Sequence, residues 1–198
     1  MTTYKIVLDP EHRYFVDGER KPGFSEICGD LGVTKENRFY TADGREEGVV
    51  LHEWLLFLAQ GKEPAEDPDP RIAGRVEGIR KFLSDTQFKF QGGETPLYHA
   101  LGFCTTPDIY GYIGNFSWVI DAKRGQKMKF HSLQTAAQKM ALLASGFNAQ
   151  KRGGLYLRDG DYRLDEHLDR DDEHRWRTLV AGYYAKTFYL EKGAHNAK

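Results

Sequence analysis

The stretch TTPDIYGYIGNFSWVIDAKRG, residues 105–125, decides how this sequence folds. Its aromatic and β-branched residues predict two β-strands, about 108–113 and 116–123. The short connection through Gly114 and Asn115 predicts that the second strand folds back on the first as a hairpin. We therefore expect these two strands to be neighbours in the central sheet.

Charged side chains lie at the open end of this hairpin. Pairing of the strands would bring Asp108, at the start of the first strand, level with Asp121, at the end of the second. Because side chains alternate along a strand, Asp121 and Lys123 project to one side and Ala122 to the other. Two carboxylates at one sheet rim repel each other unless a cation lies between them, and hard oxygen ligands favour Mg²⁺ or Mn²⁺. The sequence therefore predicts a metal site with a lysine beside it.

The composition limits the classes of protein to consider. The chain has 198 residues, of which 40% are hydrophobic, enough for one domain with a core. Its 28 basic and 29 acidic residues give a formal net charge of −1, so no overall field favours a nucleic acid or a membrane. Two cysteines, Cys28 and Cys104, are too few for a disulfide scaffold or an iron–sulfur cluster. The longest apolar run contains His52 and Glu53 and no signal segment is evident, so we expect a soluble cytoplasmic protein.

Helices and further strands are expected around the hairpin. Residues 44–61 predict a helix in which Val50, Trp54, Phe57 and Leu58 repeat at helical spacing. The other expected elements are strands at 4–8, 13–16, 86–91 and 94–101, helices at 70–83 and 131–146, a hairpin with its turn at Asp159 and Gly160, and a last helix capped by Asp169. This order predicts an α/β fold with one mixed sheet flanked by helices.

The motif at the hairpin has a familiar form. Pro107-Asp108 followed by Asp121-Ala122-Lys123 resembles the PD-(D/E)xK nuclease superfamily, in particular its RecB-like branch, which includes phage exonucleases. Three further positions resemble that branch: His52 on the first long helix, Glu94 before the core strands and Gln134 on the next helix. The early segment YFVDGERKPGFSEICGDLG, residues 14–32, is also similar to the lead-in segment of phage members.

The match is incomplete at several positions. Gln138 stands where the branch often has a tyrosine, and Thr105 and Thr106 stand where relatives often have glycine. A second (D/E)xK match, at residues 19–21, lies in what we predict to be a polar turn without a strand before it. Short motifs of this kind therefore identify a site only through their context.

The resemblance implies a fold, an activity and a set of roles. The fold would be a restriction-endonuclease-like core within a single domain, divided into a lead-in segment (1–45), a helical part (46–85), a catalytic core (86–165) and a carboxyl-terminal helix (169–193). The activity would be that of a magnesium-dependent deoxyribonuclease, an exonuclease on linear DNA in phage or bacterial recombination or repair. The implied catalytic residues are Glu94, Asp108, Asp121, Lys123 and Gln134, and the implied metal ligands are His52, Asp108, Asp121 and the carbonyl of Ala122.

The resemblance also implies partners. Mg²⁺ would be the cofactor, with Mn²⁺ as a substitute and no iron–sulfur cluster. DNA would be the substrate, and a single-strand annealing recombinase is a candidate protein partner. The basic stretch KRGQKMK, residues 123–129, would steer phosphates to the site through Arg124, Lys127 and Lys129, with an affinity that falls as salt rises.

Other interpretations of the same residues stay open. The same site would serve an endonuclease or a flap-processing nuclease, and a nuclease scaffold can also carry a non-catalytic DNA-binding or regulatory protein. Without the other motif residues, His52 would be interpreted as a histidine at the edge of the core. Likewise, Asp121 and Lys123 would be interpreted as an ion pair at a strand end. We interpret His12, His99, His131 and the two cysteines as structural.

Overall fold

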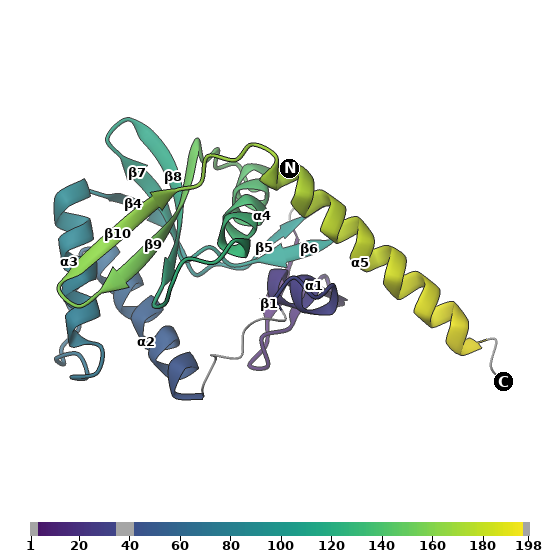
Figure 1. Cartoon of the computed structure of the whole chain (residues 1–198), viewed down its shortest axis with the longest axis horizontal. Coiled ribbons are helices and arrows are strands. Elements are labelled where there is room, and N and C mark those ends of the chain that lie inside the picture. Colours follow the sequence, from purple (N-terminus) through teal and green to yellow (C-terminus); the bar gives the residue numbers. More distant parts are fainter. Residues whose placement is uncertain (1–3, 35–41, 196–198) are drawn as a thin grey trace.

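A five-stranded mixed sheet forms the centre of the protein (Figure 1). The computed structural model describes residues 4–34 and 42–195, except for the side chains of 42–45 and 191–195. The sheet has the order β10-β9-β8-β7-β4, and only β8 and β9 run parallel. Its strands are β4 (Lys89–Gly92), β7 (Ile109–Ile113), β8 (Phe116–Lys123), β9 (Lys151–Arg158) and β10 (Asp161–Glu166). The mixed sheet and the β7–β8 hairpin were both predicted, and both are confirmed.

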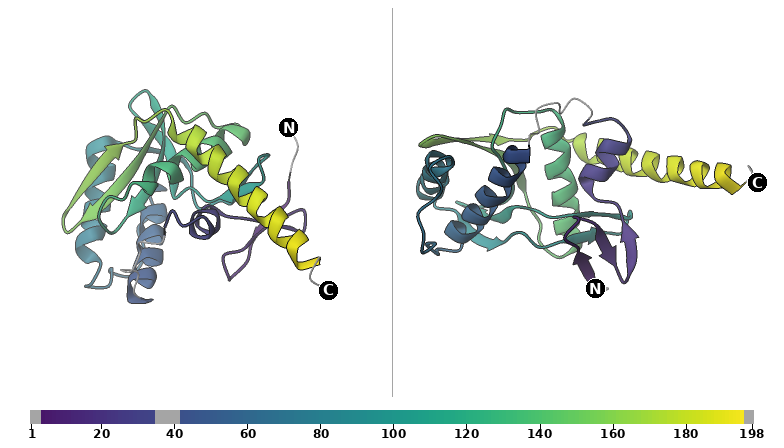
Figure 2. Two further views of the ribbon diagram at one scale, coloured as in Figure 1. Left: turned by 45° about the vertical axis from the view of Figure 1, so that its right-hand side comes forward. Right: turned by 90° about the horizontal axis from the view of Figure 1, so that it is seen from below.

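Helices cover the two faces of this sheet. On one face lie α2 (Ala42–Ala59) and α3 (Ala73–Thr86), and on the other lies α4 (Phe130–Ala144), which connects β8 to the parallel strand β9 (Figures 1 and 2). Beyond α4 lie α1 (Phe24–Asp30) and the long helix α5 (Asp172–His195), whose far end extends away from the rest of the molecule. No helix in the described part of the chain is long and apolar enough to cross a membrane.

The alternation of side chains along β8 decides where the site faces. Trp118, Ile120 and Ala122 belong to the core cluster that also contains residues of α2 and α3, whereas Val119 packs with Leu142 of α4. Asp121 and Lys123 have the same parity as Val119, so both point toward α4. The charged end of the strand is therefore directed at the helix that follows it in sequence.

The first residues form a separate antiparallel sheet. It consists of β1 (Ile6–Leu8), β2 (Tyr14–Val16) and β3 (Glu19–Lys21). The first two strands were expected, but the prediction of a polar turn at 19–21 was wrong. Asp17 and Gly18 both have positive φ and turn the chain tightly enough for Glu19 to pair with Val16.

The prediction of a core strand at 94–101 was also wrong. The strand there is β5 (Leu97–His99), and it pairs with an unpredicted strand, β6 (Phe103–Thr105), in a two-stranded sheet outside the central one. Gly102, with φ of 95°, makes the tight turn between them. The three residues of β6 are all buried, so their pattern lacks the alternation by which a strand is recognised.

The predicted apolar face of α2 is confirmed at Trp54 and Leu58 and is wrong at Val50 and Phe57. Leu51, Trp54, Leu55 and Leu58 are buried, whereas Val50 and Phe57 are 37% and 45% exposed. A helix with apolar residues on most sides has several faces on which apolar residues recur at helical spacing. The elements that pack against the helix therefore decide which of these faces is buried. On α3 the predicted stripe is confirmed, since Ile72, Val76, Ile79 and Phe82 are buried.

Candidate metal-binding active site

The hairpin brings two aspartates together at its open end. Ile109 pairs with Ile120 in the ladder, which puts Asp108 beside Asp121, one step further along each strand. Asp108 is 6% exposed and Asp121 is 1% exposed. The backbone N–H of Ala122 donates a hydrogen bond of 2.6 Å to Asp108 Oδ2. The predicted juxtaposition of the two carboxylates is therefore confirmed.

Asp108 forms a group of three potential metal ligands with His52 and Glu94. His52 of α2 lies with Nε2 3.6 Å from Asp108 Oδ2 and with Nδ1 3.7 Å from Glu94 Oε1. One ligand atom from each of these three residues lies within 4.8 Å of the other two. Glu94 reaches this point from a loop in which its own φ is 48° and its N–H donates to the carbonyl of Pro107. The imidazole ring thus lies between two carboxylates.

This group of ligand atoms fits a small divalent cation. Carboxylate oxygens suit Mg²⁺ and Mn²⁺, imidazole is more typical of transition-metal sites, and ligands on opposite sides of a small divalent ion are about 4 Å apart. A single ion would therefore hold His52, Glu94 and Asp108 together after a small closure of their present spacing. The carboxylate of Asp121 adjoins this group but is held by other side chains.

The buried Asp121 and the partly buried Lys123 form an ion pair that one helix, α4, holds in place. The Nζ of Lys123 contacts Asp121 Oδ2 and also donates to Gln134 Oε1 of α4 at 3.0 Å. One turn further along α4, the Nε2 of Gln138 donates to Asp121 Oδ1 at 2.9 Å. The structure thus brings Gln134 to the predicted lysine and adds Gln138, to which the sequence analysis gave no role. Its spacing of four residues from Gln134 was the available signal, since such residues share a helix face.

The carboxylates of Glu94, Asp108 and Asp121 together carry more negative charge than the basic side chains beside them neutralise. Burial and the neighbouring Asp108 raise the pKa of Glu94 to about 7. Burial raises the pKa of Asp108 to about 6, although the nearby His52 opposes this increase. Burial would also raise the pKa of Asp121, but the ammonium of Lys123 and the bond from Gln138 hold it below its usual value. Asp108 and Glu94 are therefore the groups that would gain most from a bound cation.

The basic residues after β8 lie against carboxylates. Arg124 forms an ion pair with Glu47 of α2, which also lies 3.7 Å from Arg75 of α3. Lys127 pairs with Asp165 at 3.0 Å. Lys129, just before α4, is exposed. Lys127 and Lys129 are both exposed, and phosphates would compete with carboxylates for Arg124 and Lys127.

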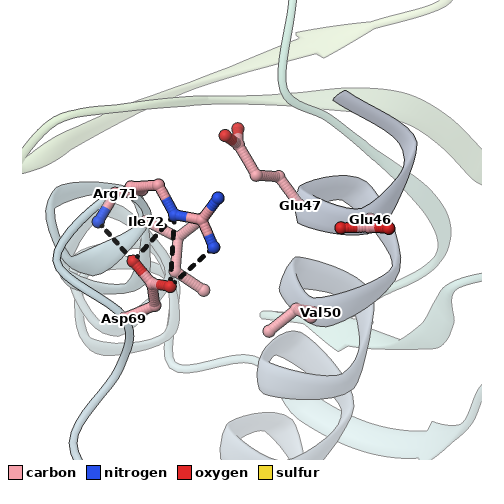
Figure 3. A pocket seen from close by; sticks show the side chains of 6 residues that line it. All are labelled: Glu46, Glu47, Val50, Asp69, Arg71 and Ile72. Atoms are coloured by element: carbon pink, nitrogen blue, oxygen red, sulfur yellow. Dashed lines mark hydrogen bonds and ion pairs between the residues drawn. The ribbon is translucent and has the colours of Figure 1, made fainter. Parts of the chain in front are cut away.

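Two cavities lie outside the ligand group. One, of about 230 Å³, is bordered by Tyr14, Thr106 and Gln134 and opens between the first sheet and the core. The other, of about 110 Å³, lies between α2 and the segment before α3 (Figure 3). There Asp69 binds Arg71 of the same segment. The second cavity is therefore lined by an ion pair whose two charges neutralise each other, and we assign no separate function to it.

The residues interpreted as structural have ordinary structural contacts. The Nδ1 of His131 lies 3.0 Å from the hydroxyl of Tyr156, and burial, with Lys123 nearby, lowers the pKa of His131 to about 4. Cys28 and Cys104 are both buried free thiols, and burial raises the pKa of each to about 12. Thiols held protonated in this way are poor nucleophiles and poor metal ligands.

Comparison with known proteins adds no constraint. No protein-family model matches this sequence, and no curated protein matches it. The resemblance to PD-(D/E)xK nucleases therefore rests on the motif residues and on the geometry that surrounds them.

Proposed function

We propose that this protein is a magnesium-dependent deoxyribonuclease with a restriction-endonuclease-like core, and that it degrades linear DNA from an end. The observation that supports this proposal best is that two groups of side chains meet at one rim of the sheet. A set of three metal ligands, His52, Glu94 and Asp108, adjoins a lysine that is ion-paired to a second aspartate. The two groups are joined by the hydrogen bond from the Ala122 N–H to Asp108.

Each group suits one requirement of phosphodiester hydrolysis. A divalent cation bound by Asp108, His52 and Glu94, with Asp121 beside it, would supply Lewis-acid stabilisation of the charge that develops on the phosphate. Lys123 would position the attacking water and complement that charge with its own. Gln134 would orient the lysine through its contact with Nζ. A strand-end ion pair with a purely structural role would not explain why two further carboxylates face it.

Cleavage of DNA of defined topology tests the proposal. Linear, nicked and covalently closed circular DNA would each be incubated with the protein and Mg²⁺, with and without a chelator. We expect loss of linear DNA alone, and no loss once the chelator is present. Cleavage of closed circles would indicate an endonuclease instead. DNA binding without any metal-dependent cleavage would indicate a binding protein.

A lysine variant and a matched control sharpen the test. Lys123→Ala should lower turnover by about two or more orders of magnitude, the scale seen when one preorganised electrostatic group is removed. DNA affinity should change little, because one phosphate contact contributes only modestly beside a whole basic rim. The melting temperature should fall, because Asp121 stays buried without its ammonium partner, so turnover is measured per folded molecule. Lys81→Ala, which removes an exposed lysine paired with Asp161 on the far side of the sheet, should cleave at the parental rate. A parental rate in Lys123→Ala would exclude the proposed site.

A further inference from the structure

Gln138 is a fully buried amide whose one close polar contact among the described residues lies in the site. It is 0% exposed, and its Nε2 donates to Asp121 Oδ1 at 2.9 Å. A second contact, to the carbonyl of Thr106, is at the outer limit of a hydrogen bond, 3.5 Å. Asp121 is therefore the main partner of this side chain.

The orientation of the amide follows from the carboxylate. A glutamine amide has a donating end and an accepting end, and only the donating end is attracted to a carboxylate. The accepting atom, Oε1, is buried and has no hydrogen-bond partner among the residues that the structure describes. An unsatisfied buried polar atom is unfavourable, and an apolar side chain of similar size would avoid it. Packing alone therefore does not explain an amide here, whereas the bond to Asp121 does.

Two glutamines on one face of α4 each bind one member of the ion pair. Gln134 accepts from Lys123, and Gln138, four residues later, donates to Asp121. Since Gln138 binds Oδ1 and Lys123 contacts Oδ2, each oxygen of the carboxylate has a separate partner. The bond from Gln138 thus determines that Oδ2 is the oxygen that faces Lys123.

We infer that Gln138 is a positioning residue for the nuclease reaction: it fixes Asp121 through Oδ1, so that Oδ2 stays directed at Lys123 and the carboxylate stays beside the group that would hold the cation. This inference rests on the proposed function. Partners that orient a ligating carboxylate change metal affinity or activity by about 10–100-fold when they are removed. Gln138 should therefore influence the metal dependence of the reaction without touching the substrate.

The test measures the dissociation constant for Mn²⁺ by calorimetry and the Mn²⁺ concentration that half-saturates DNA cleavage. Gln138→Met keeps the side-chain volume but removes the donor, and we expect both quantities to rise by about 10–100-fold. The melting temperature should stay near the parental value, because the substitution also removes the unsatisfied Oε1. A high Mn²⁺ concentration should restore part of the lost rate, which a purely structural defect would not allow.

A control on the same helix separates positioning from packing. Thr135 is also fully buried on α4, but its hydroxyl lies 2.8 Å from His167 Nδ1, away from the carboxylates. Thr135→Val should lower the melting temperature and leave both Mn²⁺ quantities unchanged. If Gln138→Met does not fold, Gln138→Asn decides the question, because it keeps the amide and withdraws it by one methylene group.

The outcomes distinguish this inference from the proposed function. If the parental protein neither binds Mn²⁺ nor cleaves DNA, the proposed function fails, and the role of Gln138 fails with it. If the parental protein does both and the folded Gln138 variant has the parental Mn²⁺ affinity and half-saturation, the inference alone is overturned.

Discussion

Two ion pairs lie in contact with α4, the partly buried pair Lys123–Asp121 and the buried pair Arg152–Asp172, and they differ in how the surrounding charge is balanced. Arg152 meets Asp172 Oδ2 at 2.7 Å and also donates to the carbonyl of Ser132 at 2.6 Å. Among the described residues its further contacts are to Thr135 and to the carbonyl of Asp169, so each of its two terminal nitrogens has two acceptors. This pair joins β9, α4 and the start of α5.

The other pair lies among surplus carboxylates. Lys123 brings one positive charge to Asp121, while Asp108 and Glu94 bring two further carboxylates to the same rim. The Arg152–Asp172 pair can only hold elements together, whereas a rim with excess carboxylates can bind a cation. We therefore expect substitutions in the first pair to change stability and substitutions at the second to change chemistry.

The largest expected effect follows from removal of a carboxylate at the rim. Asp108→Asn or Asp121→Asn should abolish cleavage and weaken Mg²⁺ or Mn²⁺ binding, because the ligand set loses a charged oxygen donor. The melting temperature should not fall much for Asp108→Asn, since that change relieves repulsion. Calorimetry with the metal and a cleavage assay measure the two effects. Asp161→Asn, an exposed aspartate paired with Lys81, is the control; unchanged metal affinity in both rim variants would refute the comparison.

The second-largest expected effect is a loss of stability when Arg152 is replaced. Arg152→Met should lower the free energy of unfolding by about 3–5 kcal/mol, because it leaves Asp172 buried without its main partner. The cleavage rate per folded molecule should stay parental. Denaturant unfolding measures the loss, and the double variant Arg152→Met/Asp172→Asn should lose less than the sum of the two single variants. A reduced cleavage rate with full stability would show that the Arg152–Asp172 pair also takes part in the chemistry.

The smallest expected effect concerns His52. His52→Ala should lower the cleavage rate about tenfold at limiting metal and less at saturating metal, because one neutral ligand is lost while the carboxylates remain. About a third of its side chain is exposed, so the melting temperature should hardly change. Metal titrations of the cleavage rate measure the effect, with Val49→Ala, one turn earlier on α2, as control. A large fall in melting temperature with a parental rate would make His52 a residue of the core edge.

Much of this arrangement could be predicted because its signals are local. The β7–β8 hairpin follows from strand-forming residues around Gly114, and its pairing places Asp108 beside Asp121 without further information. The common face of Asp121 and Lys123 follows from the period of a strand. These relations require only the geometry of neighbouring residues, and all of them are confirmed.

The remaining features depend on contacts between distant segments. The sequence does not reveal that α2 buries Leu51 and Leu55 rather than Phe57, because the packing of α3 and the sheet against it selects the stripe. The strand β6 is too short and too completely buried to show a period. The role of Gln138 depends on the crossing of α4 over β8, which no local pattern specifies.

The hydrogen bond from the Ala122 amide to Asp108 has a consequence for observing the site. Backbone amides exchange their hydrogen with solvent only when their bonds open, at rates that range from those of fraying loops to those of the stable core. Ala122 lies in β8, between β7 and β9, and its amide is bonded to a carboxylate of the proposed site. The rate of deuterium uptake at this amide would therefore report how often the Asp108 side chain leaves its position in the free protein, without DNA.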